Sequence, residues 1–257
     1  MFSLFRCFSV SLLLDIAKIL DKKGDAVAAR SAFYDYFSKP EPNTPEQNLF
    51  YARLKYGELT KAAGKDVSKH WKNTLAIYEK LDDSLKSDPF IRLVIEEVKY
   101  DLAYTATRKY YDLKFSGPGP GRASPAYIKK VLNKQIKAKK EALTELEQLF
   151  FEVAQMGAGQ YTVSAIVEIG HAYDDYADAL QNSYIPAFFD EDQAELYKMK
   201  LEDQAYTYHE KATEAYIQAL AFAFKSNVYI DSTAEATRRL GELRPDEYPE
   251  LTELLLT

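Results

Sequence analysis

The chain is poor in the residues from which covalent and metal-centred chemistry is built. It has one cysteine, Cys7, and three histidines, His70, His171 and His209, among 257 residues. A single cysteine excludes an internal disulfide and a cysteine-based zinc cluster, and it does not decide the compartment. The motifs G-x-S-x-G and H-E-x-x-H are absent from the sequence, so we expect no catalytic residue and no cofactor.

Positive charge is also in short supply. The chain carries 33 lysines and arginines against 39 aspartates and glutamates, which gives a formal net charge of −6. Nucleic acid is therefore not the expected partner, because phosphate binding requires a basic surface. Aromatic residues are plentiful, with 20 Tyr and 14 Phe, whereas disordered chains are poor in them. The composition is that of a folded protein.

Alternation of apolar and polar residues, the mark of a half-buried strand, is missing, and a helical period of 3.6 residues runs through most of the chain. Proline follows a capping residue at Thr44-Pro45, Asp88-Pro89 and Ser124-Pro125, a pattern that begins helices. Gly24, Gly64 and Gly157 follow helical runs and end them. The sequence thus predicts an all-α fold of antiparallel helices at about 3–23, 26–38, 45–63, 66–86, 89–115, 125–156, 160–183, 190–226 and 231–243.

The first twenty residues, MFSLFRCFSVSLLLDIAKIL, are unusually apolar. The run is too short and interrupted for a transmembrane helix, and it lacks the early positive charge and small-x-small site of a signal peptide. We interpret it as the first structural helix, which predicts a cytoplasmic protein for the chain as given. If the sequence is a piece of a longer chain, an export signal and a periplasmic or envelope location stay open.

One segment, Ser116-Gly-Pro-Gly-Pro-Gly-Arg122, is of low complexity. Glycine-rich loops can cradle phosphate, but a P-loop needs GxxxxGK[ST] after a strand. Alternating glycine and proline more simply break two helices and form an exposed turn, so we interpret this segment as a linker.

Small and aromatic residues recur at fixed positions in successive helices. The clearest first helix carries Ile166, Ile169, Gly170 and Tyr173, and its second helix carries Ala212, Tyr216 and Ala219. A similar set opens the chain, with Ala17 followed by Ala29, Phe33 and Tyr36. This pattern resembles the tetratricopeptide repeat, in which small residues let two helices approach and an aromatic side chain fills the gap.

The resemblance extends more loosely over the rest of the chain. Tyr56-Gly57 with Leu75 and Tyr78 would form a second pair, and Leu102-Ala103 with Ala142, Leu146 and Leu149 a third. In the last pair 38 residues separate Tyr173 from Ala212, where the family has about nine, so some residues are inserted. The expectation is one helical-repeat domain over 1–257, an α-solenoid with pairs at 3–38, 45–86, 89–156 and 160–226 and a C-terminal cap at 231–257.

Such a domain implies a protein-interaction scaffold, because stacked helix pairs form a curved surface lined by the first helix of each pair. Segments of the last hundred residues, such as Glu168-Ile-Gly-His-Ala-Tyr and Leu243-Arg-Pro-Asp-Glu-Tyr-Pro249, are similar to repeat proteins of gliding and predatory bacteria. Some of those proteins are linked to adventurous gliding motility in the cell envelope. The resemblance implies a comparable location.

The segment EIGHAYDDYAD, Glu168 to Asp178, is the best candidate for a functional site. On a helical wheel its carboxylates and His171 lie opposite the apolar stripe of Ile166, Ile169 and Tyr173, which predicts an exposed acidic face. Glu168-x-x-His171 also has the spacing of ferritin-like di-iron bundles. Such a site needs a second Glu-x-x-His, and neither His70 nor His209 provides one, so a metalloprotein using Glu168 and His171 is the alternative rather than the expectation.

The repeat resemblance also implies which residues line the partner groove. A groove of tyrosines and carboxylates suits a protein or peptide of basic character. The implied residues are Ser164, Val167, His171, Asp174 and Asp175 in the last pair, Tyr51 and Glu58 in the second, and Tyr100, Tyr104 and Arg108 in the third. These residues could equally be ordinary surface positions.

Two further features have a structural and a functional interpretation. The run from Arg122 to Lys140 holds six lysines between Lys129 and Lys140 and no acid. A run of this kind is usually a solvated helix face, although an anionic lipid surface or an acidic partner would also fit it. The leucine-rich end, Tyr248 to Thr257, is expected to cap the array, and a docking tail is the alternative.

Overall fold

A computed structural model describes residues 10–115 and 124–249, and every regular element within these ranges is helical. The all-α prediction is therefore confirmed. The chain divides into two compact units, residues 1–102 and 103–257, which are described separately below. A single repeat domain over the whole chain stays a prediction. No helix in the described ranges has the length and apolar character needed to cross a membrane.

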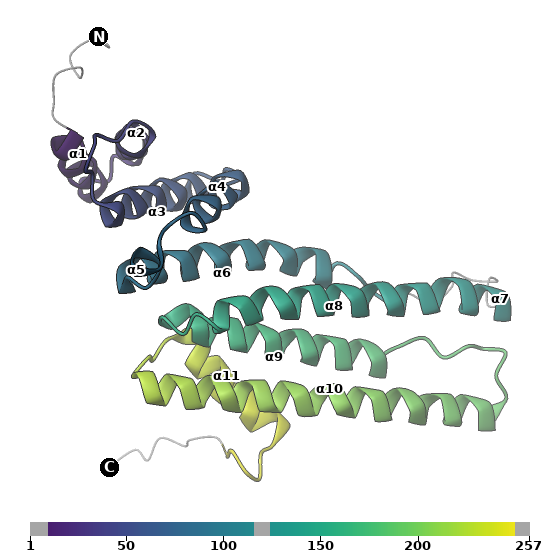
Figure 1. Cartoon of the computed structure of the whole chain (residues 1–257). Coiled ribbons are helices and arrows are strands. Elements are labelled where there is room, and N and C mark those ends of the chain that lie inside the picture. Colours follow the sequence, from purple (N-terminus) through teal and green to yellow (C-terminus); the bar gives the residue numbers. More distant parts are fainter. Residues whose placement is uncertain (1–9, 116–123, 250–257) are drawn as a thin grey trace. The chain divides into compact units, whose positions relative to one another are not determined.

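The described part of the first unit, residues 10–102, contains five helices and the beginning of a sixth. They are α1 (Val10–Lys22), α2 (Ala26–Ser38), α3 (Glu46–Ala62), α4 (Ser68–Tyr78), α5 (Asp83–Lys86) and the first part of α6 (Pro89–Tyr111), as Figure 1 shows. The predicted helix 66–86 is wrong in one respect, because it is two helices. Asp82 breaks it: its carboxylate accepts a hydrogen bond from the backbone N–H of Leu85 at 2.9 Å and caps the start of α5.

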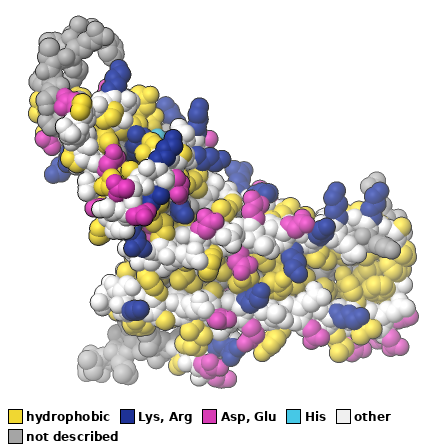
Figure 2. Space-filling view, viewed as in Figure 1, with side chains coloured by type: hydrophobic (Ala, Val, Ile, Leu, Met, Phe, Trp, Pro, Cys, Tyr) yellow, Lys and Arg dark blue, Asp and Glu magenta, His cyan; other side chains and the backbone are white. Residues whose placement is uncertain are grey.

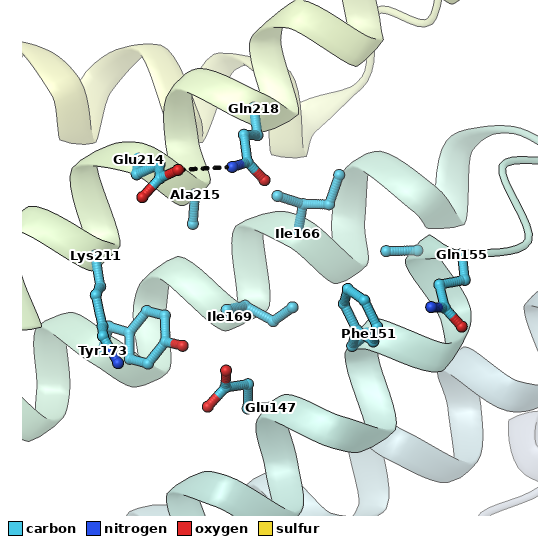
Figure 3. Close-up of a pocket in the computed structure, with 11 residues that line it drawn as sticks. Glu147, Phe151, Gln155, Ile166, Ile169, Tyr173, Lys211, Glu214, Ala215 and Gln218 are labelled. Atoms are coloured by element: carbon cyan, nitrogen blue, oxygen red, sulfur yellow. Dashed lines mark hydrogen bonds between the residues drawn. The ribbon is translucent and has the colours of Figure 1, made fainter.

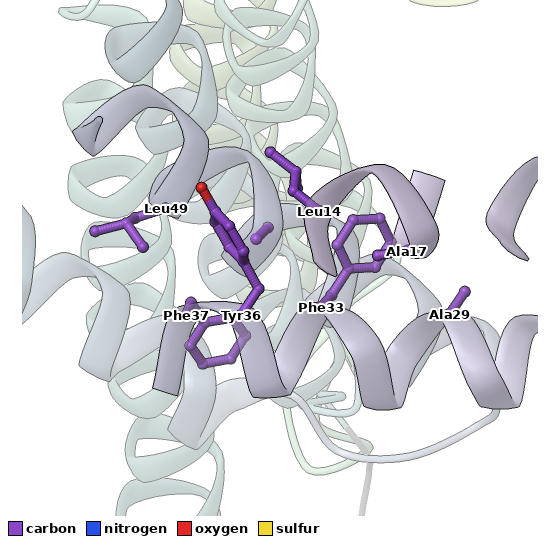
Figure 4. Close-up of a cluster of buried hydrophobic side chains, with 8 residues drawn as sticks. Leu14, Ala17, Ala29, Phe33, Tyr36, Phe37 and Leu49 are labelled. Atoms are coloured by element: carbon purple, nitrogen blue, oxygen red, sulfur yellow. The ribbon is translucent and has the colours of Figure 1, made fainter. Parts of the chain in front are cut away.

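The core of the first unit forms where α1, α2 and α3 meet (Figure 4). Ala17 of α1 and Ala29 of α2 have no exposed surface, and Phe33 fills the space beside them. Two alanines permit a close approach of the helices, and the large aromatic ring buries apolar surface next to them. Leu14, Tyr36, Phe37, Leu49 and Ala52 complete this cluster.

A glycine and a tryptophan join α3 to α4 in the same unit. A Cβ atom on Gly57 would overlap the six-membered ring of Trp71, so only glycine fits under this ring. The indole N–H of Trp71 donates a hydrogen bond of 2.8 Å to the Oδ2 atom of Asp101, which also forms an ion pair with Lys61. The ring is buried, and its one polar atom has a partner.

The second unit is built mainly from three long helices, α8, α9 and α10, that run alongside one another. After the end of α6 come α7 (Pro125–Tyr127), a π-helical turn (Ile128–Leu132), α8 (Asn133–Ala154), α9 (Gln160–Gln181), α10 (Glu191–Ser226) and α11 (Asp231–Leu243). Helix α9 lies between α8 and α10 and contacts both, while α11 packs against α9 and α10 (Figure 1). The predicted boundaries 125–156, 160–183, 190–226 and 231–243 agree closely with these elements.

Local chemistry explains most of the helix ends. Gly24, Gly64 and Gly157 have φ values of 78°, 70° and 59°, the left-handed conformation expected after a helix. Ser124 caps α7 as predicted, since its hydroxyl accepts a hydrogen bond from the N–H of Tyr127. The predicted cap at Thr44 is wrong, because its hydroxyl donates instead to the carbonyl of Glu41 at 2.8 Å. The predictions for residues 3–9, the linker 116–122 and the tail 250–257 lie outside the described residues.

We expect Gly57→Ala to lower the free energy of unfolding even though alanine is the better helix former. Overpacking against Trp71 should cost about 1–3 kcal/mol, which exceeds the roughly 0.5–1 kcal/mol gained in helix propensity. Urea denaturation measures the difference. In a Trp71→Leu background the same Gly57→Ala change should become neutral or stabilising. Equal destabilisation in both backgrounds would show that the ring is not the obstacle.

Candidate functional site

Other helices cover most of the acidic face of α9, which is therefore not the open surface that the sequence predicts; of its carboxylates only Asp178 stays exposed. Asp174 is 3% exposed and Val167 is 2% exposed, so neither lies on an accessible groove. Ser164, His171 and Asp175 are half-buried. The helical wheel is wrong here because it assumes that α9 has one buried side. This helix has α8, α10 and α11 around it, and all three bury parts of its surface.

Asp174 is the centre of a buried polar network that joins three helices. Its Oδ2 atom accepts hydrogen bonds from Nη2 and Nε of Arg239 on α11, at 2.6 and 3.2 Å, and from the hydroxyl of Tyr216 on α10 at 2.9 Å. Its Oδ1 atom lies 3.3 Å from Nδ1 of His209, also on α10. Burial, followed by the charge of Asp174, raises the pKa of Tyr216, so this hydroxyl stays protonated and donates.

Further polar contacts attach α11 to the same side of the unit. The hydroxyl oxygens of Ser164 and Ser232 are 2.9 Å apart, and Nε2 of His171 lies 3.3 Å from Oε1 of Glu235. Burial lowers the pKa of His171, and the carboxylate of Glu235 opposes this effect. Three of the predicted groove residues, Ser164, His171 and Asp174, are therefore brought together in space, and each contacts α11.

Asp175 pairs with a lysine that the sequence places in an exposed run. Lys139 is fully buried, and its Nζ atom lies 2.7 Å from Oδ2 of Asp175 and donates a 3.0 Å hydrogen bond to the carbonyl of Leu113. The same ammonium group is 4.2 Å from the ring centroid of Tyr110, whose hydroxyl donates to the carbonyl of Ala172. For Lys139 the interpretation as a solvated residue is wrong, because its side chain is buried. These partners compensate for the removal of its charge from water.

Four other lysines of that run are on the surface. Lys130, Lys134, Lys137 and Lys140 are exposed, and the side chain of Lys129 lies outside the described part of the chain. Lys137 is 3.8 Å from Glu141, an ordinary surface pair. Lysine or arginine side chains project from the end of the unit that carries α7 (Figure 2). Their contact with a lipid surface or an acidic partner stays a prediction.

Glu168 and His171, the residues of the alternative metalloprotein hypothesis, have different surroundings. His171 is directed at Glu235, whereas burial raises the pKa of Glu168 to about 7. In residues 10–115 and 124–249 there is no group of three or more His, Cys, Asp or Glu side chains that could hold a metal ion. A carboxyl group with such a pKa is protonated about half the time at neutral pH.

The remaining predicted groove residues are divided between the two units. In the first unit Tyr51 packs edge-on against Phe33 with ring centroids 6.0 Å apart, Glu58 forms a 2.6 Å ion pair with Lys55, and Tyr100 is half-buried. In the second unit Tyr104 is half exposed, and Arg108 lies 3.9 Å from Asp112 at the surface. That these five residues line one groove together with the α9 residues stays a prediction.

An open groove lies on another side of α9, where α8 and α10 flank it (Figure 3). Its volume is about 400 Å³. Ile166 and Ile169 of α9 are partly exposed in it, and Phe151 of α8 is 49% exposed. The other lining residues are Glu147, Ala154, Gln155, Tyr173, Lys211, Glu214, Ala215 and Gln218.

Charged groups stand around this apolar floor. Glu147 comes from α8, while Lys211 and Glu214 come from α10. The ammonium group of Lys211 lies 5.2 Å from the ring centroid of Tyr173, and Gln218 donates a 3.1 Å hydrogen bond to Glu214. Burial and the neighbouring Glu147 raise the pKa of Tyr173, which therefore remains a neutral hydrogen-bonding group. An apolar floor with a polar rim is typical of protein-binding surfaces.

The helical pattern does not predict this groove, because Ile166, Ile169 and Tyr173 lie on the apolar stripe that is expected to face the core. One signal points to it. Phe150 and Phe151 are consecutive on α8, and side chains 100° apart on a helix cannot both face the same neighbour. Phe150 is fully buried and Phe151 is half exposed. Figure 2 shows hydrophobic side chains gathered along the middle of this helical unit.

Comparisons of the chain with protein-family models, with curated proteins and with solved structures find no match.

Replacing Glu168 should change how stability depends on pH. Because the folded chain holds the pKa of Glu168 above its ordinary value of 4.5, its stabilising contribution is complete below about pH 4.5 and is lost as pH rises towards 7. Glu168→Gln should therefore be more stable than the wild type by about 1–3 kcal/mol at pH 8 and similar to it at pH 5. Urea denaturation at both pH values measures this, with the exposed Glu195→Gln as control. A stability difference that does not change with pH would contradict the assignment.

Removing the charge of Asp174 should loosen α11. Asp174→Asn leaves the guanidinium of Arg239 without its carboxylate, so we expect a loss of about 3–5 kcal/mol in the free energy of unfolding. Asp178→Asn is the matched control, since this carboxylate is one turn away and 61% exposed and should cost less than about 1 kcal/mol. Equal effects of the two substitutions would show that Asp174 contributes no more to stability than an exposed carboxylate, which would contradict its central role in the network.

Proposed function

We propose that the chain is a non-enzymatic helical-repeat scaffold of the tetratricopeptide type and that it binds a partner protein or peptide. The observation that carries the proposal is the open groove between α8, α9 and α10, with its partly exposed Ile166, Ile169 and Phe151. Exposed apolar side chains in a concave surface with a charged rim favour association with another polypeptide. The groove is the candidate binding site.

Contacts inside the helix pairs support the repeat interpretation. A Cβ atom on Gly170 of α9 would lie 2.6 Å from the ring of Tyr216 on α10, which parallels the arrangement of Gly57 and Trp71 on α3 and α4. Ala212 and Ala219 flank Tyr216 on α10 and are fully buried. In both of these pairs a glycine receives an aromatic ring, which is the kind of contact that the repeat resemblance implies.

The chemistry of the groove indicates how a partner would be held. Three hydrophobic side chains on two helices can accept the apolar face of a helix or an extended segment. The carboxylates of Glu147 and Glu214 stand at its rim, and Lys211 is already placed against the ring of Tyr173. The rim therefore favours a partner with basic residues beside its apolar anchors. A role in an envelope or gliding-motility assembly remains part of this proposal through the resemblance alone.

Site-specific cross-linking in the source cells tests the groove. A photo-reactive amino acid at Gln155, which lines the groove, should yield a defined cross-linked protein, whereas the same group at exposed Gln204 on α10 should not. Ile169→Asp should reduce the cross-linked product about tenfold or more, because a charge in an apolar contact carries a desolvation cost.

Two controls separate loss of binding from loss of folding. Phe151→Asp changes a side chain that is already half exposed, so this variant should fold normally and still lose the cross-link. Tyr206→Asp, at a side chain 64% exposed and outside the groove, should leave it intact. Identical products from Gln155 and Gln204, or a product unaffected by both groove variants, would contradict the proposed function.

A further inference from the structure

Polar side chains make many of the contacts that hold helix α11 to the second unit. Only Ala236 and Leu240 of this helix are buried. The side chains that attach it are Ser232, Glu235 and Arg239, which contact Ser164, His171 and Asp174, and Arg244, which pairs with Glu210 through two contacts of 2.6 and 2.7 Å. Two fully buried apolar side chains therefore oppose the departure of α11, together with these polar contacts.

The footprint of α11 includes three of the five α9 positions that the repeat resemblance assigns to a partner groove. Ser164, His171 and Asp174 are groove-lining positions in that assignment, and each has a polar atom within 3.3 Å of a polar atom on α11. The three side chains that reach them, Ser232, Glu235 and Arg239, are spaced i, i+3 and i+7 and share one face of the helix. A helix thus already occupies the predicted recognition surface from within the same chain.

We propose that α11 is a built-in occupant of this surface and that a partner helix presenting an arginine to Asp174 replaces it. The inference rests on the proposed function of a scaffold. It adds a second binding surface to this scaffold, specifies the chemistry of the partner that binds there, and makes α11 the element that controls access to it. The site is distinct from the open groove, which lies on another side of α9 and is lined by none of the three α9 residues that contact α11.

The contacts of α11 define the chemistry of the partner. Asp174 takes a guanidinium through two N–H donors, Nε and Nη2, at 3.2 and 2.6 Å. Lysine would not reproduce this fork, so the partner must supply an arginine. A glutamate four residues before the arginine would face His171, and a serine or threonine three residues earlier would face Ser164, as Glu235 and Ser232 do.

The connection between α10 and α11 sets how strongly α11 competes. It runs from Asn227, which has a φ of 54°, to Ile230, so α11 remains tethered next to its site. A short tether gives a millimolar effective concentration, and a free helix can displace α11 only if its affinity exceeds this competition. Weakening the contacts of α11 should therefore expose the site to a free helix.

A synthetic peptide of residues 229–249 is the probe, labelled with a fluorophore and measured by anisotropy against the full chain. We expect weak binding to the wild type and binding at least about tenfold tighter to the Arg239→Gln chain, since the internal helix has lost its charged hydrogen bonds while the peptide retains them. Peptide carrying the same Arg239→Gln change should not bind. Arg239→Lys is the second chain variant, which keeps the charge and loses the fork.

A disulfide across the contact provides a reversible control. Ser164→Cys with Ser232→Cys, in a Cys7→Ser background that also carries Arg239→Gln, places two thiols where hydroxyl oxygens are 2.9 Å apart. Oxidation fixes α11 in place and should abolish peptide binding, and reduction should restore it. The same protein thereby serves as its own control for folding.

The results separate this inference from the proposed function. Unchanged peptide affinity in both Arg239 variants, with circular dichroism showing a folded chain, would overturn the inference, and so would binding that is insensitive to oxidation. Either outcome would make α11 a fixed part of the fold. The cross-link at Gln155 and its loss in Phe151→Asp would be unaffected, because those residues line the other surface.

Discussion

The carboxylate of Asp174 is the constraint on which the second unit depends. A charge that is 3% exposed is tolerated only when its hydrogen-bonding capacity is met, and here Arg239, Tyr216 and His209 meet it from two other helices. The position of α11 follows from this requirement. Without the guanidinium, α9 and α10 would enclose a carboxylate beside a tyrosine and a histidine, and without the carboxylate α11 would keep two buried apolar residues as its main attachment. We infer that the ion pair fixes where α11 packs, because removing either partner alone would leave the other charge buried without compensation.

Helix boundaries are predictable from the sequence because they are set by local interactions. A glycine such as Gly64 ends a helix through its own backbone conformation, and Ser124 starts one through a hydroxyl that reaches a backbone N–H three residues away. The break within 66–86 is harder to predict. The cap at Asp82 is also a local interaction, but no proline follows it to mark the start of a helix. The repeated small and aromatic residues also locate true contacts, as Gly170 and Tyr216 show.

The candidate site is less predictable because it depends on how many neighbours each helix has. A helical wheel assigns α9 one buried side, whereas α8, α10 and α11 surround it. Lys139 shows the same difficulty: nothing in a run of lysines distinguishes the one whose ammonium group meets Asp175 and the carbonyl of Leu113. These contacts join residues 26 or more positions apart, and their formation depends on the long-range packing of whole helices. Charge pattern alone therefore identifies acidic segments but not their exposure.

The two surfaces of α9 differ in what a partner must overcome. In the open groove Ile166, Ile169 and Phe151 are already partly in contact with solvent, so association gains apolar burial without removing any part of the chain. At the α11 surface a partner gains ionic and hydrogen-bonding contacts equal in kind to those it displaces, and its advantage must come from contacts beyond the footprint of α11. A partner that engages both surfaces would satisfy this condition, because binding at the groove raises its local concentration beside Asp174. Helix α9 would then couple the two events, since it contributes residues to each surface.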